Sequence, residues 1–130
     1  MVGIVVISHS SKIAEGVVEM ALQMAPEVPM IAAGGTSDGR IGTDVEKISE
    51  AIKKVYSEDG VLIIFDLGSA YMNAEMAMDF LIGEVDTDKI EIVDCALIEG
   101  GITAAVESSI GSNRETIKET LKPLVLNKMP

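Results

Sequence analysis

The chain lacks the residues on which several classes of protein depend. It has a single cysteine, Cys95, so no disulfide bond can form within it, and a reducing cytoplasm is its natural setting. Cys95 itself is expected to be a small buried apolar residue. Basic residues are scarce, because 10 lysines and arginines stand against 21 acids and give a formal net charge of −11. This charge repels nucleic acid and anionic membrane surfaces, so we expect neither as a partner.

Long apolar runs and cofactor motifs are missing as well. Runs such as 2–7 and 60–65 fall far short of the ~20 residues of a membrane helix, and the first residues do not resemble a secretory signal. Neither GxxxxGK(S/T) nor GxGxxG occurs, so nucleotide binding by this chain has little support. No Cys/His cluster indicates zinc, and no EF-hand spacing indicates calcium. We therefore expect no cofactor and no metal.

The pattern of apolar residues predicts an α/β fold. The 130 residues are 48% hydrophobic, which is typical of one folded domain with a real core, here 1–130. Short runs rich in Val and Ile alternate with stretches of helical period, as in a parallel sheet with crossover helices. The predicted structure is an open sheet of four parallel strands with helices on both faces. Strands are expected at 2–7, about 28–32, 60–65 and 89–93, and helices near 12–24, 43–55, 70–82, 101–109 and 113–123.

Local signals predict where two of these helices begin. Thr43 with Glu46, and Ser112 with Glu115, each have the spacing of a capping box. The residues after Pro123 are expected to be frayed. The glycine-rich pieces 34–42 and 100–101 are short and lie between predicted elements, and Gly68 and Gly83 are expected to be loop or helix-end residues.

Ligands of open parallel sheets gather beyond the carboxyl ends of the strands. The loops to consider are therefore 8–11, 33–42, 66–69 and 94–100.

His9, the only histidine, directly follows the first predicted strand and lies where the first helix begins. A lone histidine is commonly a structural residue. Here, however, a group attached to the ring would face the free N–H groups of a helix start, which stabilise an anion. A phosphoryl group would bring about −1.5 to −2 charges to this point. Ser10 and Ser11 are candidates to donate to phosphate oxygens or to cap the helix, and capping is expected for at least one of them.

Asp66 follows strand 60–65, which we expect to lie beside the first strand. A carboxylate beside an imidazole accepts the Nδ1 proton and leaves the Nε2 lone pair free to attack phosphorus. Capping of the next helix is an equally open role for Asp66. Gly68 and Ser69 are expected to supply donors to a bound phosphate, or simply to turn the chain. Together with His9, these residues indicate a phosphoryl carrier.

Two further features leave alternatives open. The glycine-rich stretch 34–43 is expected to be a mobile loop at the rim of the site, and its Arg40 is a candidate for steering a phosphate, although a solvated arginine is the commoner case. Met72, Met76 and Phe80 recur every four residues on the predicted helix 70–82. Such a stripe is usually part of a core, and a subunit interface is the alternative.

Four stretches together resemble one family: IVVISHSSKIAEGV (4–17), GGTSDGRIGTD (34–44), FDLGSAYMNAEMA (65–77) and ALIEGGITAAV (96–106). The chain is similar to the phosphoryl-carrier subunit of bacterial phosphoenolpyruvate-dependent dihydroxyacetone kinase. That subunit is related to the mannose-class IIA domains of the sugar phosphotransferase system, whose three-layer fold the resemblance implies for this chain.

The resemblance also implies roles and partners. His9 would be phosphorylated on Nε2, and Asp66 would hold its Nδ1 side. The donor would be the small histidine-containing phosphocarrier protein, and the acceptor would be ADP on a separate kinase subunit, where the ATP formed phosphorylates dihydroxyacetone. The chain would be a homodimer. Because some relatives carry upstream phosphotransfer domains behind this one, and this sequence stops at Pro130, we expect the donor to be a separate protein.

Two alternatives remain at this stage. A IIA domain of a mannose-class sugar transporter would be the same carrier with another acceptor. Mannose-class sequences usually carry Gly-Gly-Ser or Gly-Gly-Thr and a proline after the aspartate, whereas this chain has Gly68, Ser69 and Ala70, which favours the dihydroxyacetone branch. A receiver-like or flavodoxin-like binding module is the second alternative. A receiver requires clustered acids after its first strand to hold Mg²⁺, and this chain has Ser-His-Ser there.

Overall fold

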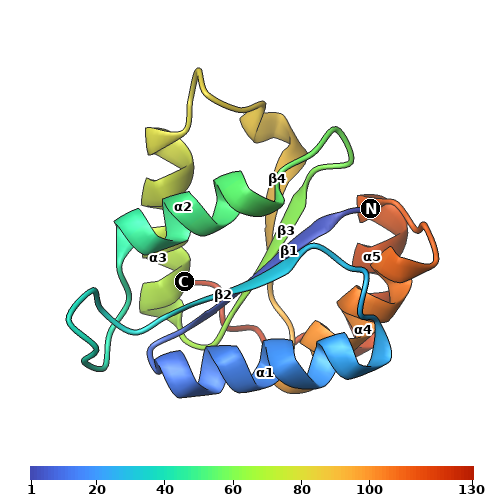
Figure 1. The fold of residues 1–130 in the computed structure, drawn as a ribbon, viewed down its shortest axis with the longest axis horizontal. Coiled ribbons are helices and arrows are strands. Elements are labelled where there is room, and N and C mark those ends of the chain that lie inside the picture. The colour runs from blue at the N-terminus through green and yellow to red at the C-terminus, as the bar shows by residue number, and fades with distance from the viewer.

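The computed structural model describes residues 1–130 and contains one sheet of four parallel strands (Figure 1). The strands lie in the order β2-β1-β3-β4. All four predicted strands and the α/β class are confirmed, and the strand bounds differ from the predicted ones by two residues at most. They are β1 (Gly3–Ser8), β2 (Met30–Gly34), β3 (Val61–Phe65) and β4 (Ile90–Val93).

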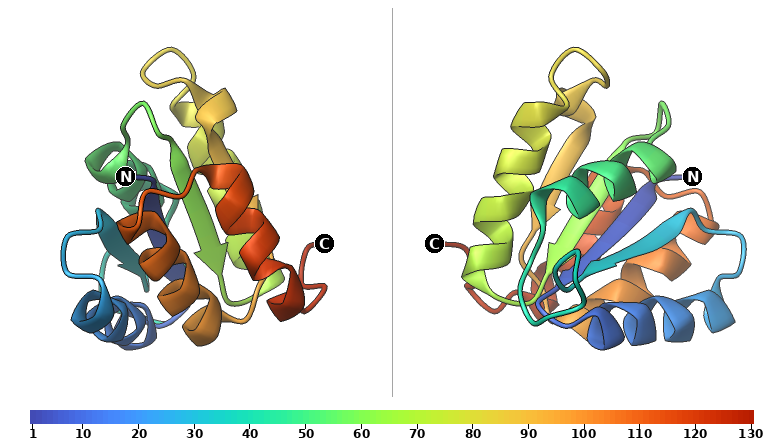
Figure 2. Two further views of the ribbon diagram at one scale, coloured as in Figure 1. Left: turned by 90° about the vertical axis from the view of Figure 1, so that its right-hand side faces the viewer. Right: turned by 60° about the vertical axis from the view of Figure 1, so that its left-hand side comes forward.

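Helices cover both faces of this sheet, as predicted (Figures 1 and 2). Helices α1, α4 and α5 pack on one face, and α2 and α3 pack on the other. None of the helices has both the length and the apolar character that crossing a membrane requires. The helices are α1 (Ser11–Met24), α2 (Val45–Val55), α3 (Gly68–Phe80), α4 (Leu97–Ser109) and α5 (Arg114–Leu121), with short 3₁₀ turns at Thr87–Lys89 and Lys122–Leu124.

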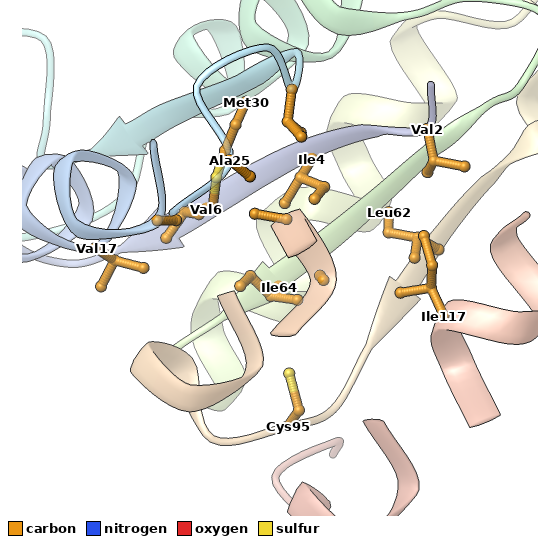
Figure 3. Close-up of a cluster of buried hydrophobic side chains, with 14 of the residues drawn as sticks. Val2, Ile4, Val6, Val17, Ala25, Met30, Leu62, Ile64, Cys95 and Ile117 are labelled. Carbon is orange, nitrogen blue, oxygen red and sulfur yellow. The ribbon is translucent and has the colours of Figure 1, made fainter. Parts of the chain in front are cut away.

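The two central strands are buried along their whole length. Every residue of β1 and β3 is buried, because each has a strand on both sides and helices on both faces, and this explains why all their residues except Ser8 are apolar or glycine. Figure 3 shows the cluster on the α1/α4/α5 face, to which Val6 and Ile64 contribute. Cys95 belongs to it, as expected, and burial raises the pKa of its thiol to about 11. The thiol therefore stays protonated at neutral pH.

The order of the strands places a crevice beside β1. From β1 the chain first crosses to β2 on one side and then returns to β3 on the other. The direction of winding therefore reverses between β1 and β3, and ligands of open α/β sheets bind at the carboxyl ends of the strands at such a point. The residues that follow β1 and β3 are His9 and Asp66.

The start of α2 differs from the prediction. Asp44 is the N-cap, and its carboxylate accepts from the backbone N–H of Glu46 at 2.9 Å and of Lys47 at 3.2 Å. The capping box predicted for Thr43 with Glu46 is therefore wrong, because aspartate is the stronger cap and directly follows the threonine.

The start of α5 is shifted in the same way. Asn113 is the N-cap, and its side chain accepts from the N–H of Thr116 at 2.9 Å. The hydroxyl of Ser112 instead donates to Glu107 at 3.1 Å. The capping box predicted for Ser112 with Glu115 is therefore wrong.

Helix α4 begins at Leu97, four residues before the predicted start, and Gly100 and Gly101, which were expected to precede or open it, lie inside it. A Cβ on Gly100 would stand 2.3 Å from Cys95 Sγ, and one on Gly101 would stand 2.8 Å from Val17 Cγ1. These glycines therefore allow α4 to pack closely against its neighbours and do not form a loop.

The methionine stripe of α3 does not lie in the core. Met72, Met76 and Phe80 are 60%, 49% and 64% exposed, so the core interpretation is wrong. The side chains that α3 packs against the sheet are small: Ala70, Ala74 and Ala77.

The segment 125–129 is bound to the sheet, so the expectation of a frayed end is wrong. Asp94, at the end of β4 and 8% exposed, accepts from the backbone N–H of Leu126 and Met129, each at 3.2 Å, and also from that of Lys128. Figures 1 and 2 show the C-terminus beside α3.

Candidate active site

The site lies where β1 and β3 end side by side. Ile7 of β1 pairs with Phe65 of β3, so the next residues of both strands emerge at the same edge of the sheet. The His9 ring and the Asp66 carboxylate face each other there, with 2.9 Å between Nδ1 and Oδ1. Their side chains are 21% and 19% exposed, which leaves the ring accessible at the surface. The pair that the sequence predicts is therefore brought together.

Asp66 is held by several donors. Its carboxylate accepts from the backbone N–H of His9 and from the Ser8 hydroxyl, each at 2.9 Å, and from the N–H of Leu67 at 2.7 Å. Burial raises the pKa of this carboxyl, but the hydrogen bonds from His9, Ser8 and Leu67 outweigh burial and hold the pKa below its ordinary value. An ionised carboxylate only accepts, so His9 Nδ1 is the donor and carries the ring proton.

The other ring nitrogen faces the start of α3. Nε2 of His9 lies 2.6 Å from the hydroxyl oxygen of Ser69, and in the neutral ring with its proton on Nδ1 the hydroxyl donates to the Nε2 lone pair. Leu67, not Asp66, is the N-cap residue of α3, and it makes no side-chain cap. Gly68 and Ser69 are the first two residues of α3, and the first N–H groups of a helix have no partner within it.

Three other predicted site residues lie at helix starts. Ser10 is the N-cap of α1, and its hydroxyl oxygen accepts from the N–H of Ile13 at 3.3 Å, which confirms capping for one of the two serines. Ser11 is the first residue of α1, and Gly68 is the first residue of α3.

The glycine-rich loop is tied to the residues of the site. Gly42 N–H donates to His9 O at 2.8 Å, and Gly35 N–H donates to Ser8 O at 3.1 Å. Arg40 lies in solvent, with a side chain that is 79% exposed and pairs with Asp38 at 2.8 Å. Arg40 is therefore a solvated arginine, which was the commoner of the two expectations.

Ser8 is a site residue that the sequence analysis did not single out. It is fully buried, and its hydroxyl donates to Asp66 and accepts from the N–H of Ser10 at 3.0 Å. The only signal in the sequence is a polar residue at the end of an apolar strand.

A second unpredicted contact ties the glycine-rich loop to α3. The Asn73 amide donates to the Thr43 hydroxyl, so the loop is fixed at the far end from Gly35 as well. Thr43, which the sequence suggested as a cap, has this role instead.

Comparison with known proteins identifies the family of this chain. The model of the family EIIA-man, described as the PTS system fructose IIA component, matches residues 3–118. The chain belongs to the EIIA-man family. Membership confirms the resemblance to the mannose-class IIA domains of the phosphotransferase system.

Within this family, the chain groups with phosphoryl donor subunits. It is 40% identical over 122 residues to the phosphoryl donor subunit DhaM of PEP-dependent dihydroxyacetone kinase 2 of Listeria innocua, a match that covers 93% of this chain and 97% of that protein. It is 36% identical over 126 residues to the phosphotransferase subunit DhaM of Lactococcus lactis, covering 97% and 98% of the two chains. The match to Escherichia coli DhaM, at 37% identity, covers 90% of this chain but 25% of that protein.

Solved structures share the fold of this EIIA-man chain. The crystal structure of EF1359, a protein of unknown function, superposes with a TM-score of 0.84 at 31% identity, over 98% of this chain and 97% of that one. A sigma-54 interaction domain protein from Enterococcus faecalis superposes with a TM-score of 0.70 at 16% identity, over 94% and 88% of the two chains, and supports the fold alone.

Proposed function

We propose that residues 1–130 work as one cytoplasmic phosphoryl-carrier domain. Nε2 of His9 takes a phosphoryl group from the histidine-containing phosphocarrier protein and passes it to ADP on the kinase subunit, where the ATP formed phosphorylates dihydroxyacetone. The observation that supports this most is the orientation of the His9 ring, with Nδ1 on Asp66 at 2.9 Å and Nε2 toward Ser69 at 2.6 Å. This places one defined lone pair at the accessible edge of the site.

In the first transfer, the Nε2 lone pair forms a bond to phosphorus while the bond between phosphorus and the donor's nitrogen breaks. The electron pair of the broken bond returns to the donor. Nδ1 keeps its proton, so the phosphorylated imidazole ring carries a positive charge. The Asp66 carboxylate, 2.9 Å from Nδ1, stabilises that charge.

The phosphoryl oxygens require hydrogen-bond donors, and one candidate donor has another partner in the structure. Ser69 donates to Nε2 in the structure and has to rotate when phosphorus bonds there, after which the same hydroxyl is free for a phosphoryl oxygen. We assign the remaining donors to the hydroxyl protons of Ser10 and Ser11 and to the backbone N–H groups of Gly68 and Ser69, since the starts of α1 and α3 favour an anion.

In the second transfer, an oxygen of the terminal phosphate of ADP attacks phosphorus, the bond from Nε2 breaks, and its electron pair returns to the ring. The transition state of phosphoryl transfer is loose, so alignment and charge stabilisation supply most of the catalysis. The acceptor subunit can therefore complete a site that this chain leaves open.

The relay is tested by intact mass spectrometry. The chain is incubated with phosphoenolpyruvate and the two general phosphotransferase proteins, and we expect one acid-labile phosphate per chain. Addition of the ADP-loaded kinase subunit should then remove it, whereas the subunit without ADP should not. Retention of the phosphate in the presence of the ADP-loaded subunit would contradict the proposed acceptor.

The family description favours a second acceptor to be tested in parallel. Because the matched family model is that of a sugar IIA component, a IIB sugar protein is the alternative recipient. Loss of the phosphate to a IIB protein, and not to the ADP-loaded subunit, would identify a sugar-transport carrier.

We also propose that the chain is a homodimer through α3. Met72, Met76 and Phe80 form one exposed apolar face, and such a face marks an interaction site more often than an ordinary surface. Light scattering at micromolar concentration should give the mass of two chains. Met76→Lys should shift this toward one chain, whereas Met24→Lys, at a methionine of α1 that is 65% exposed, should not. A monomeric wild-type chain would contradict the proposal.

A further inference from the structure

The side chain of Lys47 binds the end of the strand next to β1 on one side. Its Nζ donates to the carbonyl of Gly34 at 2.8 Å and to that of Thr36 at 3.4 Å. Gly34 is the last residue of β2 and pairs in the sheet with Ser8, the last residue of β1. The ammonium group of Lys47 therefore lies one strand away from the end of β1.

Lys128 makes the equivalent contact on the other side. Its Nζ donates to the carbonyl of Phe65 at 2.6 Å and lies 5.0 Å from the centre of the Phe65 ring. Phe65 is the last residue of β3 and pairs with Ile7 of β1. The Asp94 carboxylate holds the backbone of the 125–129 segment and so fixes Lys128 in this position.

Neither lysine is neutralised by an acid, although the chain has 21 acidic residues. No carboxylate lies in ion-pair contact with Lys47 or Lys128, and the carbonyl groups that they bind carry no net charge. Most other basic side chains do form ion pairs: Arg40, Lys53, Lys89, Arg114, Lys118 and Lys122. Two positive charges without an ion-pair partner therefore lie at the ends of the strands that flank β1, the strand that precedes His9.

These charges suit the phosphorylated state. Phosphorylation adds about −1.5 to −2 charges next to the Asp66 carboxylate, at an edge where the strand-end carbonyl groups also present negative dipoles. Neighbouring strands lie about 5 Å apart, a distance shorter than the Debye length of about 8 Å at physiological ionic strength. The strand ends that the two ammonium groups bind, at Gly34 and Phe65, therefore lie within the range over which a positive charge acts on a phosphorylated His9.

We propose that Lys47 and Lys128 supply the positive charge that stabilises phosphorylated His9, each acting from the end of a strand that flanks β1. They are positioning residues that act at a distance on the phosphoryl group and on the strand ends that carry the site. This inference rests on the proposed function and concerns the same site.

The test measures how phosphate is distributed at equilibrium between the chain and the phosphorylated donor protein. Lys47→Gln and Lys128→Gln should each lower the equilibrium constant for phosphorylation by roughly 3- to 10-fold, the size expected of one nearby screened charge. Lys47→Arg and Lys128→Arg should restore it. The difference between wild type and the glutamine variants should shrink as salt is added, because salt screens the charges.

Lys54→Gln is the matched control. It makes the same change of charge on the same helix as Lys47, about 10 Å further along its axis, at an exposed lysine without an ion pair. It should leave the equilibrium constant unchanged. Circular dichroism verifies that each variant is folded. If loss of the Lys128 side chain loosens the 125–129 segment, the test of the proposal rests on the Lys47 variants.

The outcomes separate this inference from the function on which it rests. If wild type takes up no phosphate, the proposed function fails. If wild type is phosphorylated and the glutamine variants match it, or if arginine fails to restore the equilibrium, the charges of Lys47 and Lys128 have no part in it and the inference is overturned.

Discussion

His9→Ala should take up no phosphate in the presence of phosphoenolpyruvate and the two general phosphotransferase proteins. The expected loss is complete, because the chain has one histidine and no other side chain presents a ring nitrogen to the donor. The mass of the intact chain, measured with and without mild acid treatment, gives the number of acid-labile phosphates directly.

Loss of the ring should leave the fold intact, since the His9 side chain lies at the surface and is not part of either core cluster. Thermal unfolding of His9→Ala therefore serves as its control and should be close to that of wild type. An acid-labile phosphate on His9→Ala would show that the phosphorylated residue has been assigned wrongly.

Asp66→Ala should slow phosphoryl transfer to the chain by roughly 10- to 100-fold, the loss typical of removing the group that orients a reacting histidine. Without the carboxylate, the Nδ1 proton is no longer held at 2.9 Å, and the ring is free to turn or to change tautomer. The measurement is a single-turnover rate with the phosphorylated donor protein.

Two companion variants make the Asp66 result specific. Asp66→Asn keeps the size of the side chain and loses its charge, so it should also be slow if the charge matters. Asp88→Ala removes an exposed acid next to the amino end of β4, away from the site, and should react at the wild-type rate. Equal single-turnover rates for Asp66→Ala and wild type would remove the carboxylate from the mechanism.

The strands and the central pair of the site were predictable because each has a strong local signal. A strand buried on both faces is apolar along nearly its whole length, and this holds for β3 and for β1 up to its last residue, Ser8. Polar residues directly after such strands then fall at the same edge of the sheet. His9 and Asp66 could be paired from this rule once their strands were taken as neighbours, although capping by Asp66 was an equally open role.

Other features depend on contacts between distant parts of the chain. Gly100 resembles a loop residue until Cys95 is known to lie against it, and Met76 resembles a core residue until the alanines of α3 are seen to face the sheet. No sequence pattern indicated that the Asp94 carboxylate binds the 125–129 segment. Each of these features is decided by tertiary packing and not by periodicity.

In the proposed carrier, the hydroxyl of Ser69 covers the Nε2 lone pair of His9 before a phosphoryl group is accepted there. Loading and unloading can then be accomplished by the turn of one short side chain, with the backbone around it unchanged. The donor and the acceptor would accordingly meet almost the same surface, and each would have to distinguish a loaded molecule from an empty one by the phosphoryl group itself.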